Sequence, residues 1–163
     1  MKITFIQVGG TIDKRYPVKA GQHGFEIGEP AYIGILENAR VNFEWQSISA
    51  FKKDSLDLSE QDVQEIVRLC QKAKTECIIV THGTDTLTRT ARALSVIRDK
   101  TIILTGAVTP EACKNSDAAF NIGTAVGAAG ALCNGVYIAM NGRVYPYDAC
   151  EKDLKTCKFM ENK

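Results

Sequence analysis

Short runs of apolar residues alternate with longer amphipathic stretches along this chain. Four short runs are mainly apolar, which is typical of strands buried on both faces of a sheet; they occupy residues 2–8, 78–81, 101–105 and 135–140. Residues 41–48 instead alternate apolar and polar side chains, as expected for a strand with one wet face near a sheet edge. The pattern therefore predicts four buried strands and one strand close to an edge.

Three amphipathic segments between these runs predict helices. Ser59 and Asp62 form a capping-box pattern, and apolar residues at helical spacing follow to about residue 74. A second helix, from residue 85 or 86 to about 97, presents one apolar face, and a third is expected over residues 116–132. Each predicted helix lies between two predicted strands.

This alternation of strand and helix favours helices on both faces of a mainly parallel sheet. Asn141-Gly142 is a strong signal for a two-residue hairpin turn, so residues 143–145 are expected to return antiparallel to the strand before them. At 163 residues the chain fits one domain of ordinary size. The predicted fold is a single three-layer α/β/α domain over residues 1–163, with a mainly parallel sheet and a C-terminal antiparallel hairpin.

Residues 13–30 fit neither a strand nor a helix, because three glycines and two prolines interrupt them. Such a segment is typical of a loop that carries function beside a rigid scaffold. Because it follows the first predicted strand directly, we expect it to form a mobile flap that acts as a lid.

The charge balance gives no sign of a macromolecular partner. Twenty basic side chains stand against nineteen acidic ones, for a formal net charge of +1, and no block of five or more basic residues occurs. Residues 118–142 carry no charge and are long enough to span a bilayer, but five glycines and three asparagines interrupt them. We therefore expect no nucleic-acid partner and no membrane span, and a small, weakly charged ligand fits better.

The six cysteines and two histidines argue against a metal site and a disulfide framework. No C-x-x-C pair occurs, so a zinc site is not expected. The start of the chain has no basic segment followed by a long apolar one, so no secretory signal is predicted. Scattered cysteines in such a chain are best explained as reduced thiols, which predicts a cytoplasmic protein.

Threonine hydroxyls gather where two of the predicted strands end. Gly9-Gly10-Thr11-Ile12 follows the first strand, and Thr81-His82-Gly83-Thr84-Asp85-Thr86 completes the strand over residues 78–81. The carboxyl ends of parallel strands form the crevice where α/β proteins bind ligands, so these two exits are candidates for two walls of one site. Hydroxyl-based covalent chemistry is the leading hypothesis.

Common phosphate-binding and serine motifs are missing from the sequence. It has no G-x-G-x-x-G, no Walker pattern and no G-x-S-x-G elbow, so no cofactor is expected. A threonine nucleophile needs a base and preorganised donors for the oxyanion, and the turn over residues 81–86 offers backbone N–H groups for this task. Asp85 alone is more often a helix cap than a catalytic group, and His82 is better explained as a structural residue than as a base.

The two threonine runs resemble the signature motifs of the bacterial-type L-asparaginases, enzymes that hydrolyse a side-chain amide through threonines. Further segments follow the order of that family along nearly the whole chain, from Ile3 to about Phe159: Asp54-Ser55-Leu56-Asp57-Leu58, Thr105-Gly106-Ala107, Asn115-Ser116-Asp117 and Phe120-Asn121. The resemblance implies the fold of the asparaginase N-terminal domain. It also implies an amidohydrolase that cleaves the side-chain amide of asparagine or of a related small amide and releases ammonia.

The resemblance gives each matching residue a role. Thr11 would be the primary nucleophile, Thr84 the second catalytic threonine, and Asp85 its partner. Ser55 would bind the α-carboxylate of the substrate. The residues implied to contact the substrate are Gly10, Ser55, Leu56, Gly83, Thr84 and Asp85.

The family also carries a catalytic lysine and a tyrosine on its flap. Counting along the segment after the fourth buried strand assigns the lysine to Lys152, with Lys155 as the alternative if the loop differs by three residues. Tyr16 is the best match to the tyrosine, and Tyr32 is the alternative. Burial would favour a neutral amine, whereas a neighbouring carboxylate would favour the ammonium, so the sequence leaves the charge of the lysine open.

Two departures from the family pattern leave an alternative function. Family enzymes of known activity continue into a C-terminal domain that lends an acidic residue to a neighbouring site, and this chain ends where that domain would begin, so we expect the second domain to be absent. Leu56 stands where many relatives carry a polar residue near the substrate's amino group, and an apolar side chain cannot form that hydrogen bond. The alternative is therefore a non-catalytic domain that binds an amino acid without turnover. Since the family assembles as dimers and tetramers, we expect a homodimer or a higher homo-oligomer.

Overall fold

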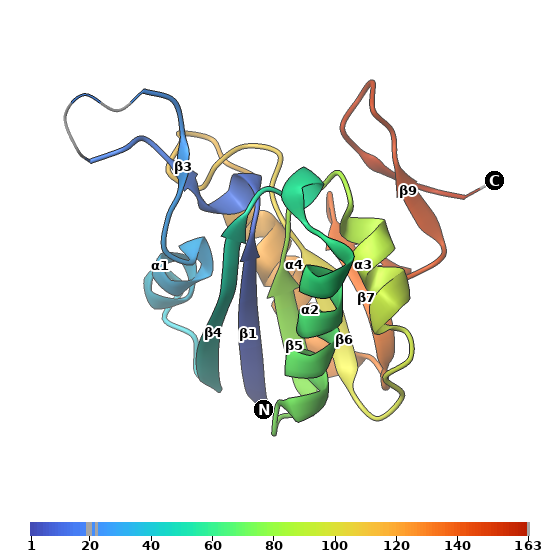
Figure 1. The fold of residues 1–163 in the computed structure, drawn as a ribbon. Helices are drawn as coiled ribbons and strands as arrows, with labels where there is room; N and C mark the ends of the chain where they lie inside the picture. The colour runs from blue at the N-terminus through green and yellow to red at the C-terminus, as the bar shows by residue number, and fades with distance from the viewer. Residues whose placement is uncertain (19–20, 22, 163) are drawn as a thin grey trace.

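A six-stranded sheet forms the centre of the fold (Figure 1). The computed structural model describes residues 1–18, 21 and 23–162. Neighbouring strands pair in parallel, apart from the last pair in the spatial order, which is antiparallel. In spatial order the strands are β4 (Glu44–Lys53), β1 (Lys2–Gly9), β5 (Cys77–Thr81), β6 (Thr101–Thr105), β7 (Gly135–Met140) and β8 (Arg143–Pro146). This sheet confirms the predicted α/β class, and β4 lies at an edge as expected.

Helices cover both faces of the sheet. One face packs against α1 (Ala31–Asn38) and α4 (Ala118–Ala131), and the other against α2 (Glu60–Lys72) and α3 (Leu87–Leu94). Each strand serves both faces because successive side chains point in opposite directions: on β1, Phe5 lies with α1 and α4, and Ile6 with α2 and α3. The result is the expected α/β/α arrangement. Within the described part of the chain, no helix is long and apolar enough to cross a membrane.

Local sequence signals explain two of the boundaries. The backbone of Asp62 donates to the hydroxyl of Ser59, and the Asp62 carboxylate accepts from the backbone of Ser59 in return, so α2 begins with the predicted capping box. The Asn141-Gly142 turn joins β7 to β8 with φ angles of 55° and 78°. The type I′ turn, which is common in two-residue hairpins, requires positive φ at both central residues, so the hairpin prediction is also confirmed.

The sequence pattern predicts neither helix α1 nor a second hairpin at the end of the chain. Helix α1 places a short apolar face against the sheet, formed by Tyr32, Ile35 and Leu36. Beyond β8 the chain forms a second hairpin, in which β9 (Cys150–Lys152) pairs antiparallel with β10 (Phe159–Glu161). The edge strand β4 also begins at Glu44 rather than at residue 41.

The flap expected over residues 13–30 contains a short antiparallel strand pair, β2 (Lys14–Arg15) with β3 (Glu26–Ile27). This corrects the expectation that the segment holds no strand. Residues 19, 20 and 22 lie outside the described part of the chain. The flap and the β9–β10 hairpin both lie at the end of the sheet where the parallel strands finish, one on each side (Figure 1).

The connections between strands create a switch point at the carboxyl ends of the parallel strands. β1 leads through α1 to β4 on one side, and β4 leads through α2 back across β1 to β5 on the other. The winding of the chain therefore reverses between β1 and β5. Open α/β sheets bind their ligands at such a switch point, outside the carboxyl ends of the strands. Both threonine motifs lie there, because they follow β1 and β5.

Candidate active site

Paired glycines let the two threonine motifs touch at the switch point. β1 ends at Gly9, and Gly10 has a φ of 87°, which residues with a side chain rarely adopt. A Cβ atom added to Gly10 would lie 2.3 Å from the Cα of Gly83 and 2.4 Å from its backbone N. The two backbones are therefore in direct contact. Thr11 and Thr84 each follow one of these glycines, so the structure brings their segments together.

The Ser55 turn lies against the same contact. A Cβ atom added to Gly83 would lie 2.6 Å from the Cβ of Ser55 and 2.7 Å from its Oγ. Ser55 opens the 3₁₀ turn η2 (Ser55–Asp57) after β4, and its carbonyl accepts from the Thr86 hydroxyl at 2.9 Å. Its own hydroxyl is buried and has no hydrogen-bond partner among the described residues. Three segments that are distant in the sequence thus meet at one point.

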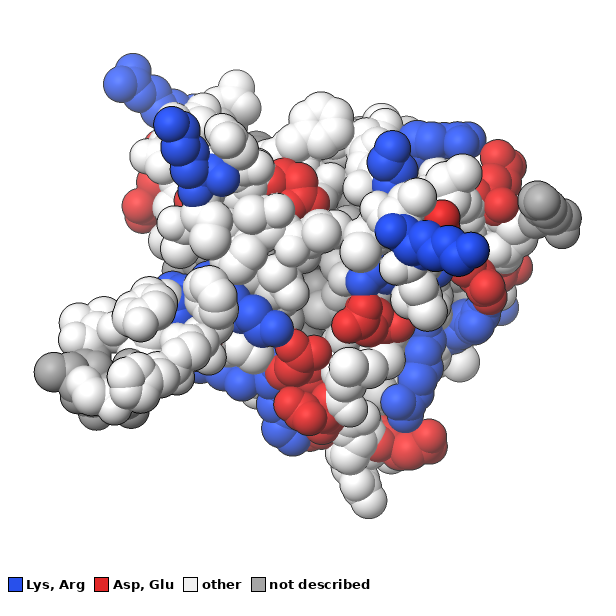
Figure 2. All heavy atoms as spheres, turned by 90° about the horizontal axis from the view of Figure 1, so that it is seen from above, with Lys and Arg blue, Asp and Glu red and all other residues white. Residues whose placement is uncertain are grey.

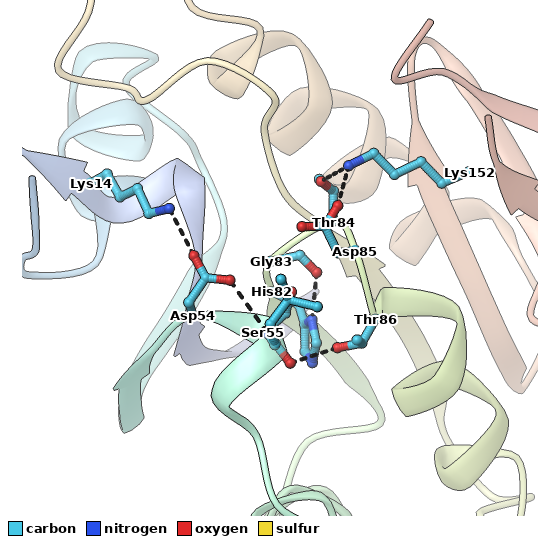
Figure 3. A network of polar contacts seen from close by, with 10 residues as sticks. Lys14, Asp54, Ser55, His82, Gly83, Thr84, Asp85, Thr86 and Lys152 are labelled. Atoms are coloured by element: carbon cyan, nitrogen blue, oxygen red, sulfur yellow. Dashed lines mark hydrogen bonds and ion pairs between the residues drawn. The ribbon is translucent and has the colours of Figure 1, made fainter. Parts of the chain in front are cut away.

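Lys152 reaches this point from strand β9 (Figure 3). Its Nζ lies 2.8 Å from the Oγ1 of Thr84 and 2.5 Å from the Oδ1 of Asp85. The lysine side chain is 12% exposed and that of Asp85 is 42% exposed, so the amine is shielded from water while the carboxylate stays open to a ligand. Lys155, the alternative, lies exposed on the connection between β9 and β10. The structure therefore brings Lys152 to Thr84 and Asp85; its catalytic role stays a prediction.

His82 is held as a neutral, structural side chain. It is fully buried, with its Nδ1 2.8 Å from the carbonyl of Gly83 and its Nε2 2.9 Å from the hydroxyl of Thr90. A carbonyl can only accept, so Nδ1 carries the hydrogen and Nε2 accepts from the threonine. Burial lowers the pKa of His82 to about 4. These contacts fit the structural role expected from the sequence.

A second ion pair ties the Ser55 turn to the base of the flap. The Nζ of Lys14 on β2 lies 2.7 Å from the Oδ2 of Asp54. Asp54 caps η2 by accepting from the backbone N–H of Leu56 at 3.4 Å. The hydrogen bond from Lys14 holds the pKa of the Asp54 carboxyl below its usual range. In Figure 3, Lys14 and Lys152 approach the Ser55 turn and the Thr84 segment from opposite sides.

The structure separates the two tyrosines that match the family's flap tyrosine. Tyr32 is fully buried, stacks on Phe5 with ring centroids 4.9 Å apart, and its hydroxyl lies 2.7 Å from that of Ser47. It belongs to the core and cannot cover the site. Tyr16 is 67% exposed on the flap, so its role stays a prediction. Leu56, beside Ser55, is 70% exposed and presents an apolar surface to any ligand there.

Sequence reasoning did not single out a buried carboxyl two residues after Thr11. Asp13 is 4% exposed; its Oδ1 accepts from the backbone of Ala31 at 2.8 Å, and its Oδ2 has no partner among the described residues. Burial raises the pKa of Asp13 to about 6. Its backbone carbonyl accepts from Gly28 at 2.8 Å, so Asp13 holds both ends of the flap. The signal available in the sequence was a charged residue directly after the apolar Ile12, which the structure buries.

The charges around the site are mixed in sign. Figure 2, which looks down on the carboxyl ends of the parallel strands, shows uncharged residues across the centre, with basic and acidic side chains around them. No extended patch of one sign stands out among the residues drawn in that view. No group of three or more His, Cys, Asp or Glu is arranged to hold a metal ion in the part of the chain described. The surroundings suit a small ligand with few charges.

Both the sequence and the fold of the chain match known proteins. A family model described as Asparaginase, N-terminal, matches residues 2–156. A glutamyl-tRNA(Gln) amidotransferase subunit from Methanococcus maripaludis is 48% identical over 158 residues, covering 86% of this chain and 35% of that protein. Glutaminase-asparaginase from Pseudomonas fluorescens is 34% identical over 154 residues, covering 87% of this chain and 42% of that protein. The solved structure of the thermostable L-asparaginase from Thermococcus kodakarensis has a TM-score of 0.83 at 27% identity, covering 99% of this chain and 51% of that one.

These relatives are longer than the chain. It spans less than half the length of both curated relatives and about half of the solved structure. The range matched by the family model runs from β1 to beyond β9. It therefore includes both threonine motifs, the Ser55 turn and Lys152.

Proposed function

The chain belongs to the asparaginase family, and from this premise we propose that it is an amidohydrolase that cleaves the side-chain amide of asparagine or of a related small amide and releases ammonia. One observation carries the proposal: Lys152 lies within hydrogen-bond distance of Thr84 and Asp85, beside the contact of Gly10 with Gly83. Covalent amide hydrolysis needs a hydroxyl nucleophile and groups that move its proton. The site offers two threonines, an amine and a carboxylate for these tasks.

Thr11 is the nucleophile in the proposed reaction. Its Oγ1 forms a bond with the amide carbon, the carbon–nitrogen bond breaks, and ammonia leaves with the proton that the hydroxyl gave up. Water then hydrolyses the acyl-threonine ester, which frees the acid and restores Thr11. The turn that begins at Thr11 is fixed against the Thr84 segment through Gly10 and Gly83, which supports a nucleophile on one wall of the site and proton transfer on the other.

Thr84 and Lys152 move the proton between the attacking hydroxyl and the leaving nitrogen in this proposal. The 2.8 Å separation of the Lys152 Nζ from the Thr84 Oγ1 supports it, because a proton can pass along a hydrogen bond of this length. Asp85 holds the amine at 2.5 Å. The exposed part of the same carboxylate is available to bind the amino group of the substrate.

Backbone N–H groups of the turn after β5 bind the oxyanion in the proposed reaction. His82 is not one of these donors, because its backbone N–H already donates to the carbonyl of Thr105 at 2.9 Å. The donors would come from Gly83 onward. Ser55 would bind the substrate's carboxylate; its hydroxyl has no other partner among the described residues, which supports this role.

The test is ammonia release from asparagine and glutamine by the purified chain and by Thr11→Val. Valine keeps the shape of the side chain and removes the nucleophile, so we expect turnover to fall by on the order of a hundredfold or more with the fold intact. Thr124→Val on α4 is the matched control and should leave turnover unchanged. A wild-type chain that releases no ammonia contradicts the activity, and an active Thr11→Val variant contradicts the nucleophile.

One comparison favours a second candidate function. The relative with 48% identity is named as a subunit of a glutamyl-tRNA(Gln) amidotransferase, whereas the glutaminase-asparaginase is 34% identical. In this alternative the same site would release ammonia for the amidation of glutamyl-tRNA(Gln). Steady ammonia release from free asparagine by the chain alone favours the first candidate, and release that depends on added glutamyl-tRNA(Gln) favours the second. Until then, the absence of a nucleic-acid partner stays a prediction.

The non-catalytic alternative and the assembly state can be tested with the same material. A melting temperature raised by asparagine without ammonia release favours a binding domain. We also propose a homodimer or higher homo-oligomer that works in the cytoplasm, where the six unpaired cysteines would stay reduced. Light scattering of the purified chain reports its mass, and a monomer would contradict the proposed assembly.

A further inference from the structure

Side chains of the β7–β8 hairpin hold the strand that faces Lys152. Phe159 on β10 is the cross-strand partner of Lys152. The backbone N–H of Phe159 donates to the Oδ1 of Asn141 at 2.9 Å, and its carbonyl accepts from the hydroxyl of Tyr145 at 3.0 Å. Both polar backbone groups of the residue opposite Lys152 are therefore bound from outside the β9–β10 hairpin.

Asn141 is itself attached to helix α4. Its backbone N–H donates to the Oδ1 of Asn121, which is fully buried on α4. The Nδ2 of Asn121 donates to the carbonyl of Gly106 at 3.0 Å and to the carboxylate of Asp117 at 2.9 Å. These partners fix the orientation of the amide, because a carbonyl and a carboxylate accept whereas a backbone N–H donates.

Gly106 lies beside the segment that carries Thr84. A Cβ atom added to Gly106 would lie 2.3 Å from the carbonyl oxygen of His82 and 3.5 Å from the Cγ2 of Thr84. Thr84 in turn lies within hydrogen-bond distance of Lys152. The series of neighbours runs from Thr84 through Lys152, Phe159, Asn141 and Asn121 to Gly106, which lies beside the carbonyl of His82.

We propose that Asn141 is a positioning residue, which sets where the amine of Lys152 lies relative to Thr84. Asn121 in turn sets where Asn141 lies relative to the site. A lysine has a long, flexible stem, so the place of its amine depends on how firmly its backbone is held. The β9–β10 pair has three residues in each strand, and an isolated two-stranded hairpin is marginal in water. The hairpin therefore needs its anchors outside the pair. The kinetic consequence rests on the proposed amidohydrolase function, whereas the geometric consequence does not.

Asn141→Gly and Asn141→Asp form a matched pair for the test. Both residues tolerate the φ of 55° found at this turn. Glycine removes the acceptor for the N–H of Phe159, and aspartate keeps one. In Asn141→Gly we expect kcat for ammonia release to fall by on the order of tenfold to a hundredfold with KM within about threefold, because the reacting groups lose their alignment. Asn141→Asp should stay close to the wild type.

A second readout does not depend on activity. Acetylation of Lys152 by an N-hydroxysuccinimide ester, followed by mass spectrometry, should be several-fold faster in Asn141→Gly than in the wild type and unchanged in Asn141→Asp. Lys155 on the same hairpin is exposed and serves as the internal reference. If Asn141→Gly does not fold, Tyr145→Phe removes the hydroxyl that binds the carbonyl of Phe159 and keeps the aromatic ring. This variant should also lower kcat and speed the acetylation of Lys152.

The outcomes separate this inference from the proposed function. A wild-type chain without ammonia release contradicts the function, and the acetylation rates still decide the positioning. Unchanged Lys152 acetylation in Asn141→Gly overturns the inference, as does an unchanged kcat in an active chain. Equal losses in the glycine and aspartate variants also overturn it, because they would show that the acceptor atom is not what matters.

Discussion

Glycine decides how near the two threonine motifs come to each other. A side chain at Gly10 would meet the backbone of Gly83 at 2.3 Å, and backbone atoms cannot rotate away as the end of a flexible side chain can. The N–H of Gly10 also donates to the carbonyl of Lys53 at 3.0 Å, so the end of β4 holds the same residue from another side. The place of Thr11 is therefore set by the residue before it.

Gly10→Ala should destabilise the fold and abolish turnover. The added Cβ atom must push the two motifs apart, and the φ of 87° adds backbone strain of about 1–3 kcal/mol. We expect the free energy of unfolding to fall by more than about 3 kcal/mol, because the strain and the overpacking act together. Urea unfolding measures this change, and the ammonia assay measures turnover.

Gly24→Ala separates the strain from the clash. Gly24 has a φ of 84°, and no described heavy atom beyond its chain neighbours lies within 4 Å of an added Cβ atom. This variant should lose about 2 kcal/mol less than Gly10→Ala, because it carries the strain alone. Equal losses at both positions would mean that the contact with Gly83 costs nothing.

At the scale of residues, the sequence could predict which segments meet but not all of their contacts. The two threonine motifs follow predicted strands of a parallel sheet, so their meeting follows from topology. Lys152 could be located only through the family resemblance, since it contacts Thr84 across 68 positions through a hairpin that no local pattern predicts. The burial of Asp13 and the bond from Phe159 to Asn141 depend on packing between distant segments, which a single sequence does not reveal.

At the scale of elements, two short strands outside the sheet carry polar groups to the site. β2 is two residues long and bears Lys14, and β9 is three residues long and bears Lys152. Elements of this length bury little apolar area by themselves and open at low free energy cost. Side-chain bonds to the rest of the molecule therefore decide how firmly each is held.

Lys14→Gln should loosen the Ser55 turn. The ion pair of Lys14 with Asp54 is partly shielded, with side chains 29% and 30% exposed, and glutamine cannot replace the charge. We expect several-fold faster amide hydrogen exchange over residues 55–57, since Asp54 caps that turn. Global stability should change by less than about 1 kcal/mol, as is usual for pairs near the surface. Hydrogen-exchange mass spectrometry and urea unfolding measure the two effects.

Lys2→Gln is the matched control for this variant. It removes an ion pair with Glu44 at the opposite end of β1, 3.2 Å between charged atoms, and leaves the flap untouched. Exchange over residues 55–57 should stay at the wild-type rate. Wild-type exchange in Lys14→Gln as well would show that the flap base does not restrain the turn.

Elements with local signals could be predicted, and elements that depend on packing could not. Helix α2 carries its own capping box, and the β7–β8 turn carries Asn-Gly. Helix α1 has eight residues, one of them Gly34, and its start is bound by the carboxylate of the distant Asp13, so its stability comes from this bond and from burying Tyr32 against Phe5. The β9–β10 hairpin likewise depends on bonds from Asn141 and Tyr145.

At the scale of the whole molecule, two buried titratable groups lie on opposite faces of the sheet, and burial shifts their pKa values in opposite directions. His82 bonds to Thr90 on α3, and Asp13 bonds to the start of α1. Burial lowers the pKa of His82 from 6.5 to about 4 and raises the pKa of Asp13 from 3.8 to about 6. Between these values the unfolded chain binds the proton of the histidine, whereas the folded chain binds the proton of the aspartate.

The two groups should therefore offset each other in the pH dependence of stability. As the pH falls from 6 to 4, His82 lowers the free energy of unfolding, because the unfolded state takes up the proton. Asp13 raises it over the same range, because the folded state takes up the proton. Asp13→Asn keeps an acceptor for the N–H of Ala31 and removes one of the two titrations. The variant should lose stability on acidification faster than the wild type, by up to about 1.4 kcal/mol per pH unit.

Urea unfolding of both proteins at several pH values between 4 and 6.5 measures this difference, and other carboxyls cancel because both chains carry them. Asp99→Asn, at an exposed position between α3 and β6, is the control for the loss of one carboxylate charge. Parallel curves for Asp13→Asn and the wild type would show that the Asp13 carboxyl is ionised in the folded chain throughout this range. The flap would then be held at its base by a buried charge rather than by a neutral acid.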